Sequence, residues 1–555
     1  MAYYDFIFGA PGSGKSRYIY KWLSDEARPH PDKKYFLFVP EQNTLKAQRE
    51  IISISEDHGM LNLDVLSFQL LFYRVIEELG ITAPAVLDDI GKALLIRKAV
   101  LEVSRKEGLN VYAGKVSSKG FIEQIKSLIS EFYQYNIDPE KLRKLQEAAK
   151  SQLLKGKLGD IANIYEAFTG ELKESRTIPE EIPLLLLKYI MRSELLKDAV
   201  IVFDGYTGFT PVQLELIGLI MPEAERLRFA LTIPSEEEPY RFIKEDITDI
   251  WWLSKKNIAA LIDTASKAGV SQSKNRDIRL SERKRYDEGI YIREAADPVN
   301  EIRLLAGSIR RNALENDIRY QKMAVIVSDP EAYKNIIGRE LRRAEIPFFM
   351  DDKKAALGSP AIELIRAACA MITESYRYDD VMRFIKNPLN LIDGKEQRGA
   401  ADELDNYLRK TGKRGRKQLE ALAENVCSEN IKHVFVLEEA LKAGKSAADK
   451  TAALEAFAAD IDITLRTEQL AKALEEKGLW KEASENRRFA GLLPEFFIRI
   501  SEVLGDENIN TKDYVKLIEA GFIDMKGGMI PETMDMVIIG DLKRSRLDDI
   551  DVLYI

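Results

Sequence analysis

The stretch that decides the fold reads Tyr3-Tyr4-Asp5-Phe6-Ile7-Phe8-Gly9-Ala10-Pro11-Gly12-Ser13-Gly14-Lys15-Ser16. It opens with a short apolar and aromatic run, as expected of a buried strand. After Ser16 the apolar residues recur at helical spacing, at Tyr18, Ile19, Trp22 and Leu23. The stretch therefore predicts a strand, a glycine-rich turn and a helix in succession, which is the context of a phosphate-binding loop.

The glycines, the lysine and the serine of this loop have different roles in phosphate binding. The glycines let backbone N–H groups converge on phosphate oxygens, and the N-terminus of the following helix adds a favourable field. Lys15 is expected to reach the β- and γ-phosphates, and the Ser16 hydroxyl to ligate Mg²⁺. We therefore predict that ATP and Mg²⁺ bind at Gly9, Ala10, Pro11, Gly12, Ser13, Gly14, Lys15 and Ser16. The alternative is a glycine turn that matches the pattern by chance.

Four further apolar runs are typical of strands in a parallel sheet, at Tyr35–Val39, Leu63–Leu66, Ala199–Phe203 and Leu227–Ile233. The third of these runs is followed by Asp204. An apolar strand that delivers an aspartate to its C-terminal end is typical of a magnesium-holding site. With helical segments between the strands, the pattern predicts an α/β fold with RecA-like parallel sheets of the P-loop type.

Length and composition favour a multidomain protein of the cytoplasm and disfavour a membrane protein. A chain of 555 residues is far longer than one hydrophobic core holds, so we expect several domains. The longest apolar runs, such as Ile182–Leu187, are too short to cross a bilayer, and no membrane partner is expected. Two cysteines, Cys369 and Cys427, cannot build a disulfide framework, which favours the cytoplasm. A net charge of −8 disfavours general DNA coating but permits a local basic channel.

The segment after the apolar run Ala199–Phe203 carries a resemblance. Asp204-Gly205-Tyr206-Thr207-Gly208-Phe209-Thr210-Pro211-Val212-Gln213 resembles motif II of superfamily 1 helicases, whose usual form is Asp-Glu-x-Gln-Asp-x-Ser/Thr-Pro-x-Gln. The magnesium aspartate (Asp204), the Thr210-Pro211 pair and the final glutamine stand in register. Gly205 replaces the glutamate that orients the attacking water, and Thr207 replaces the following glutamine. We therefore assign no catalytic residue here and expect slow hydrolysis.

Other segments resemble parts of helicases that contact nucleic acid. Val65–Gln69 resembles the motif that touches single-stranded DNA, and Val537–Ile555 resembles motif V. Thr411–Lys417 is the densest basic cluster. Such clusters can bind phosphate groups, but a single one is more often a solvent-exposed turn. These segments supply the DNA-contact candidates Ser67, Phe68, Arg414, Arg416, Arg544 and Arg546. Ala324–Val327 and Ile346–Phe349 resemble the motif IV strand and the strand after it.

Two further segments belong to the same ordered set of motifs, Val39-Pro40-Glu41-Gln42 and Arg544-Ser545-Arg546-Leu547. The whole set resembles the AddB family and the related RexB proteins. AddB proteins supply one of the two chains of bacterial AddAB helicase–nucleases. The resemblance spans the chain and is strongest at the motifs. It implies an AddA-type helicase–nuclease chain as partner in a heterodimer. It also implies ATP-dependent helicase and exodeoxyribonuclease activity of the complex, resection of double-strand breaks for recombinational repair, and recognition of a recombination hotspot (Chi) in single-stranded DNA.

Members of that family are about twice as long and carry a C-terminal nuclease domain with an iron–sulfur cluster. We therefore expect this chain to be an N-terminal fragment, with the nuclease, the cluster and the motif VI arginine beyond residue 555. By analogy with helicases, residues 1–90 and 198–285 form a first RecA-like domain around a helical insert, 91–197. Residues 286–378 and 530–555 form a second, truncated RecA-like domain around a helical insert, 379–529. Residues 271–288 are polar and are expected to be a linker.

Functions of different classes remain open. The first is a subunit with a degenerate motor that binds nucleotide and single-stranded DNA. The second is a self-sufficient P-loop ATPase or kinase, which the length and the replacement at Gly205 disfavour. The third is a non-hydrolysing structural scaffold, which the intact Lys15 and Ser16 disfavour. DNA-stimulated ATPase activity without a small-molecule acceptor separates the first from the second, and absence of nucleotide binding favours the third.

Overall fold

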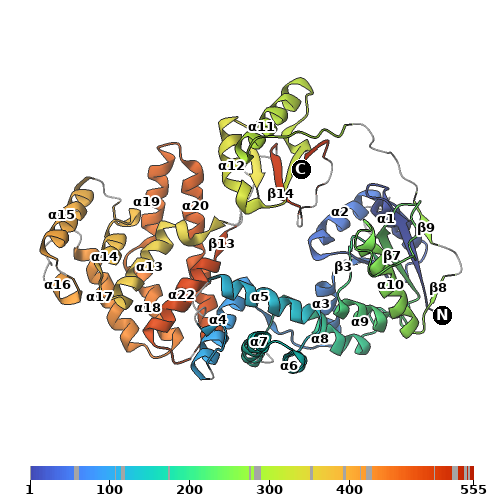
Figure 1. Cartoon of the computed structure of the whole chain (residues 1–555), viewed down its shortest axis with the longest axis horizontal. Helices are drawn as coiled ribbons and strands as arrows, with labels where there is room; N and C mark the ends of the chain where they lie inside the picture. Colours follow the sequence, from blue (N-terminus) through green and yellow to red (C-terminus); the bar gives the residue numbers. More distant parts are fainter. Residues whose placement is uncertain are drawn as a thin grey trace. The chain divides into compact units, whose positions relative to one another are not determined.

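The computed structural model describes residues 2–55, 62–106, 108–113, 119–172, 176–273, 277–280, 289–350, 354–391, 395–412, 414–420, 428–505, 507–527, 535–542, 545, 547 and 550–555. The chain divides into two compact units, Met1–Tyr286 and Asp287–Ile555. Each unit contains a parallel sheet and many helices, labelled in Figure 1. The coarse expectation of an α/β fold with parallel sheets is confirmed.

The sheet of the first unit contains five of the strands expected from the sequence. Its strands are β1 (Tyr3–Gly9), β2 (Tyr35–Phe38), β3 (Leu63–Leu66), β6 (Val200–Phe203), β7 (Arg226–Thr232), β8 (Ser271–Gln272) and β9 (Ile278–Arg279). Their order is β3-β2-β6-β7-β1-β8, and β9 also pairs with β1. All these pairings are parallel. The longest runs from Tyr3 opposite Arg226 to Gly9 opposite Thr232.

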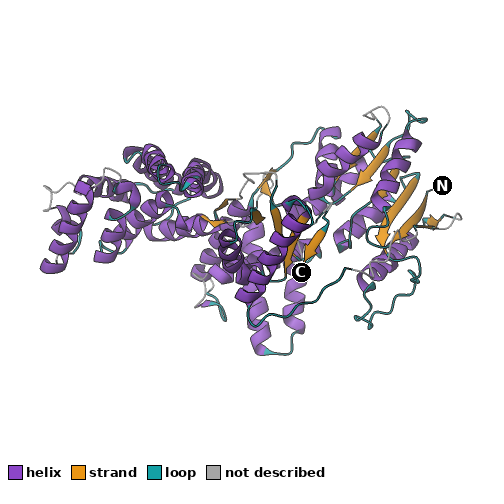
Figure 2. Ribbon diagram, turned by 90° about the horizontal axis from the view of Figure 1, so that it is seen from above, coloured by secondary structure: helices purple, strands orange, loops and turns teal. Residues whose placement is uncertain are grey.

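Helices cover both faces of this sheet, and Figure 2 shows the orange strands flanked by purple helices. One face packs against α1 (Lys15–Ala27) and α2 (Thr44–Ile54), and the other against α3 (Phe68–Glu78), α8 (Ile182–Tyr189), α9 (Pro211–Ile220) and α10 (Trp252–Lys267). Ile7 of β1 faces the first group, while Phe6 and Phe8 face the second. Burial on both faces explains why the strands read as continuous apolar runs.

The polar segment expected to be a linker contributes β8 and β9 to the sheet edge. Ser273 N donates to Tyr4 O at 2.8 Å, and Leu280 N donates to Phe8 O at 2.8 Å. Backbone pairing with the open edge of β1 needs no apolar side chain, so hydropathy did not reveal it. Part of this segment is therefore sheet.

Between β3 and β6 lies a helical region built from α4 (Asp89–Lys106), α5 (Lys119–Gln134), α6 (Pro139–Ala148) and α7 (Gln152–Glu171), with a two-stranded pair, β4 (Ala85–Val86) and β5 (Arg176–Thr177). Asp160 of α7 is buried and accepts backbone N–H bonds from Asn110, Val111 and Tyr112, at 2.9, 2.8 and 3.1 Å. Helix α8 packs instead in the core of the sheet, so the α/β body resumes before residue 198.

The second unit has a parallel sheet of order β11-β14-β10-β15. Its strands are β10 (Met323–Val327), β11 (Phe348–Met350), β14 (Val537–Asp541) and β15 (Val552–Tyr554), with α11 (Pro298–Glu315) and α12 (Pro330–Arg343) packed in the same core. Residues 289–292 pair with no strand among the described residues, although they form an apolar run. An apolar run forms a strand only where a sheet edge receives its backbone.

The rest of the second unit is helical. Its elements are α13 (Pro360–Thr373), α14 (Tyr378–Ile385), α15 (Lys395–Thr411), α16 (Arg416–Glu420), α17 (Ser428–Ala443), α18 (Ala447–Asp460), α19 (Ile463–Glu475), α20 (Trp480–Gly491), α21 (Leu493–Leu504) and α22 (Thr511–Asp524), with a small pair, β12 (Lys354–Ala355) and β13 (Lys526–Gly527). Helix α13 packs against α14, α20 and α22. This helical body therefore begins at α13, before residue 379.

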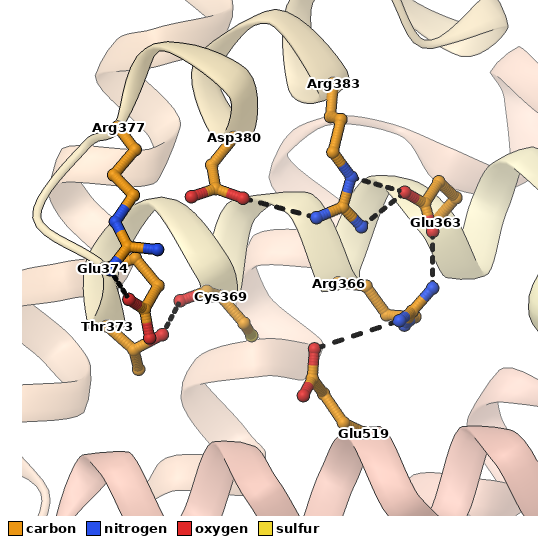
Figure 3. Close-up of polar contacts among 9 residues, drawn as sticks. All are labelled: Glu363, Arg366, Cys369, Thr373, Glu374, Arg377, Asp380, Arg383 and Glu519. Carbon is orange, nitrogen blue, oxygen red and sulfur yellow. Dashed lines mark hydrogen bonds and ion pairs between the residues drawn. The ribbon is translucent and has the colours of Figure 1, made fainter.

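Ion pairs connect three helices of this body, as Figure 3 shows. Glu363 of α13 accepts from Arg383 of α14 at 2.6 Å and from Arg366 at 2.7 Å, and Arg366 also reaches Glu519 of α22 at 4.0 Å. Burial raises the pKa of Cys369, which lies between the two arginines in sequence, to about 12, so its thiol stays protonated at neutral pH. Across the described part of the chain, no helix is long and apolar enough to cross a membrane.

Candidate nucleotide-binding site

The glycine-rich loop joins the carboxyl end of β1 to the start of α1. Gly12 and Gly14 have φ values of +75° and +84°, a left-handed conformation that glycine adopts without steric cost. A Cβ on Gly9 would lie 2.3 Å from Ser13 Oγ and 3.2 Å from Lys15 Cγ. The backbone conformation therefore favours glycine at Gly12 and Gly14, and a side chain at Gly9 would have to displace the Ser13 side chain.

Lys15 folds back over this loop. Its Nζ donates to the backbone oxygens of Gly9 at 2.8 Å and Ala10 at 2.9 Å. Burial lowers the pKa of Lys15, while the Asp204 carboxylate acts in the opposite direction. The Ser13 hydroxyl is buried and has no hydrogen-bond partner among the described residues. A buried hydroxyl of this kind retains the capacity to donate to a ligand oxygen.

Asp204 directly follows β6 and is only 4% exposed. Its carboxylate accepts hydrogen bonds from the hydroxyls of Ser16 and Tyr20, both on α1. Burial raises the pKa of Asp204, and the two hydroxyls and the Lys15 ammonium oppose that shift. The fold thus brings Ser16 and Asp204 together from positions far apart in the sequence. Tyr20 was not predicted, although its position one turn after Ser16 is a signal for it.

The donor set fits a hard divalent cation and a phosphate group. Mg²⁺ prefers hydroxyl and carboxylate oxygens, which Ser16 and Asp204 provide. A phosphate prefers backbone N–H groups at a helix start together with a cation, which the loop and Lys15 provide. Residue type and placement are therefore compatible with Mg²⁺ and a nucleotide.

Gly205, the position of the missing glutamate, has a φ of +76°. Beyond it, Thr210 and Gln213 form a capping box at the start of α9: Thr210 N donates to Gln213 Oε1 at 2.9 Å, and Gln213 N donates to Thr210 Oγ1 at 3.3 Å. Thr210 and Gln213, two of the residues that match motif II, therefore have a structural role as helix caps. Asp204, another residue that matches motif II, contacts Ser16 at the end of the glycine-rich loop.

Ser67 and Phe68, proposed as DNA contacts, lie at the start of α3. Ser67 Oγ caps the helix by accepting from Leu70 N at 3.2 Å. The Phe68 ring is 5% exposed and packs 5.7 Å from Phe38 and 6.0 Å from Tyr206, centroid to centroid. Both side chains therefore have a structural role in the described conformation, and their contact with DNA stays a prediction.

The arginine candidates differ in their surroundings. Arg416 lies among carboxylates, with Glu420 at 2.7 Å and Glu438 at 3.1 Å, and it also pairs with Glu439. Arg414 is exposed. Arg544 and Arg546 lie outside the described residues. A phosphate contact of these arginines likewise stays a prediction.

The fold and the site define a class. The chain is an α/β protein in which a glycine-rich loop follows strand β1 of a parallel sheet, and a buried aspartate after β6 accepts hydrogen bonds from the helix that begins in that loop. A family described as "ADDB, N-terminal" matches residues 6–292, more than half of the chain of 555 residues. The chain belongs to this AddB N-terminal family.

Curated relatives support the same assignment along the whole chain. A protein from Lachnoclostridium phytofermentans, named as the B subunit of an ATP-dependent helicase/deoxyribonuclease, is 31% identical over 594 residues, which cover 99% of this chain and 51% of the relative. Proteins of the same name from Alkaliphilus metalliredigens and Clostridium novyi are 27% and 28% identical, with 51% and 50% of their lengths covered. The chain spans about half the length of the curated relatives it matches.

Proposed function

We propose that the loop Gly9–Ser16 and Asp204 bind Mg²⁺-ATP in a RecA-like P-loop domain. The observation that carries this proposal is the convergence of Lys15 and Ser16 with the buried Asp204. Lys15, whose ammonium donates to the carbonyls of Gly9 and Ala10, would contact the β- and γ-phosphates of a bound nucleotide. Ser16 and Asp204 would hold Mg²⁺, which would offset phosphate charge when bound.

Replacing Lys15 with alanine tests this site. Lys15→Ala removes the cation that faces the phosphates, so Mg²⁺-ATP affinity measured by calorimetry should fall by roughly two orders of magnitude or more. Lys21→Ala is the matched control, because Lys21 lies on the same helix and is exposed. Unchanged affinity in Lys15→Ala, at an unchanged thermal midpoint, would refute the assignment.

We further propose that the chain is the helicase-like N-terminal region of an AddB-type subunit that acts in the cytoplasm with an AddA-type partner. The relatives are named as subunits of an ATP-dependent helicase/deoxyribonuclease, which supports a role in processing DNA ends for recombinational repair. In this proposal the AddB-type chain grips single-stranded DNA and reads the hotspot sequence. Its own motor hydrolyses ATP slowly, because Gly205 cannot orient a water molecule.

Binding to single-stranded DNA has a direct test. Affinity of the chain for an oligothymidine should fall steadily as salt rises, because phosphate contacts release counterions. Affinity that is indifferent to salt, or absent at low salt, would contradict a basic DNA channel.

A further inference from the structure

A long irregular segment joins β7 to α10 in the first unit. Residues 233–251 contain no helix or strand. Connections of this length without secondary structure are uncommon in compact domains and are usually either functional or flexible linkers. Four aliphatic side chains of this segment and of the first turn of α10 are solvent-exposed: Ile243 at 43%, Ile247 at 76%, Ile250 at 87% and Leu253 at 64%.

The segment is held in place although it is irregular. Lys255 of α10 is buried and its Nζ contacts two acidic residues of the segment, Glu237 at 3.0 Å and Asp249 at 2.8 Å. The indole N–H of Trp252 donates to the backbone oxygen of Lys244 at 3.2 Å, and the ring of Phe242 lies 5.8 Å from that indole. The aliphatic side chains are thus displayed by an anchored backbone.

The exposed side chains follow a regular spacing. They recur at intervals of four, three and three residues. The backbone between them forms successive turns. In these turns Asp246 N donates to Ile243 O, Asp249 N to Asp246 O and Trp252 N to Asp249 O, each at 3.0 to 3.3 Å. Scattered exposed aliphatic residues need no explanation, but a regular series on one anchored segment indicates an interaction surface.

The segment is acidic, which indicates what kind of partner it can bind. Residues 234–253 contain six acidic side chains (Glu236, Glu237, Glu238, Glu245, Asp246 and Asp249) and two basic ones (Arg241 and Lys244), a net charge of −4. Glu236, Glu245 and Asp246 are exposed. Nucleic acid and anionic membranes repel such a surface, because both are negatively charged. A protein surface with an apolar centre and a basic rim is complementary to it.

We propose that residues 243–253 form a docking surface for the other chain of the helicase–nuclease. Ile243, Ile247, Ile250 and Leu253 supply its apolar contact, and the surrounding carboxylates pair with lysines or arginines of that chain. This proposal rests on the proposed function, since it requires the protein to work as part of a complex.

The experiment measures association of this protein with the purified AddA-type protein, by biolayer interferometry. Ile247→Ser/Ile250→Ser should weaken binding by about tenfold or more, because apolar anchors dominate such interfaces. Glu245→Lys/Asp246→Lys should weaken it mainly at low salt, since exposed charges are screened at high salt. The matched control is Leu153→Ser/Leu154→Ser, two exposed leucines in the same unit.

The outcomes separate the two proposals. If the unaltered protein does not bind the AddA-type protein, the proposed function as its partner fails. If it binds, and Ile247→Ser/Ile250→Ser binds equally well, only the docking surface is refuted. The docking surface is also refuted if the leucine control loses as much affinity. Loss of binding to oligothymidine or to phosphatidylglycerol vesicles, with affinity for the AddA-type protein intact, would assign the surface to another partner. All variants should keep the thermal midpoint and the Mg²⁺-ATP affinity.

Discussion

Gly205 differs from the helicase motif both in its side chain and in its backbone conformation. In the helicase pattern this position holds the glutamate that orients the attacking water. Here the backbone has a φ of +76°, a conformation that disfavours any side chain with a Cβ. A glutamate at this position would therefore strain the backbone, and we expect that adding the side chain alone does not create a hydrolytic site.

Gly205→Glu should not produce an active ATPase. The free energy of unfolding should fall by about 1–2 kcal/mol, the cost of a left-handed conformation for a residue other than glycine. Steady-state turnover with single-stranded DNA should stay far below the tens per second that ordinary motors reach, since a carboxylate added on a strained backbone is not expected to orient the attacking water. Gly208→Glu is the control, because Gly208 has open space around it and no positive φ. Robust turnover in the unaltered chain would contradict the degenerate motor, and robust turnover in Gly205→Glu alone would show that the side chain suffices in spite of the backbone conformation.

At the scale of elements, the pairing of β1 with β7 contains a buried ionic contact. Asp5 lies opposite Arg228 in the register and accepts from Arg228 Nε at 2.6 Å and from Arg226 Nη2 at 2.6 Å. The guanidinium of Arg228 stacks on Trp22 of α1, 4.2 Å from the ring centroid. Burial raises the pKa of Asp5 to about 6, so the carboxylate is ionised at neutral pH and balances the two arginines.

Removing this carboxylate should strongly destabilise the first unit. Asp5→Ala leaves two guanidinium groups without their counter-charge, one of them buried, which costs about 3–5 kcal/mol. Chemical denaturation at neutral pH measures the change. Lys33→Ala is the comparison, because the Lys33–Glu225 pair is similarly short, at 2.8 Å, but exposed, and should contribute less than about 1 kcal/mol. Equal losses in the two variants would show that burial does not decide the strength of the Asp5 contact.

At the scale of the whole molecule, every residue of the candidate nucleotide site lies in the unit Met1–Tyr286. Gly9–Ser16, Tyr20 and Asp204 come from β1, α1 and the end of β6. The matched family region, residues 6–292, covers nearly the same part of the chain. Ground-state nucleotide binding should therefore be a property of the first unit.

A polypeptide of residues 1–286 should bind Mg²⁺-ATP with an affinity within about threefold of the whole chain, because the contacts that hold the ligand are all present. Calorimetry measures the affinity, and circular dichroism verifies that the polypeptide is folded. Lys15→Ala in the same polypeptide is the negative control. A folded polypeptide without affinity would show that the second unit completes the site.

The sequence by itself determined the positions of the strands that carry the site, the loop Gly9–Ser16, and the family to which the chain belongs. These features are local, because hydrophobic period, glycine placement and motif order are written in consecutive residues. It also indicated Asp204, since an acidic residue directly after an apolar strand is a local signal.

Only the tertiary structure decided which side chains meet and which are buried. It brought Tyr20 to Asp204, enclosed Phe68 in an aromatic core, surrounded Arg416 with carboxylates and paired Asp5 with two arginines. It also joined β8 and β9 to the edge of β1 through backbone hydrogen bonds. Such contacts depend on the packing of segments far apart in the chain, and a pattern of neighbouring residues contains no information about that distance.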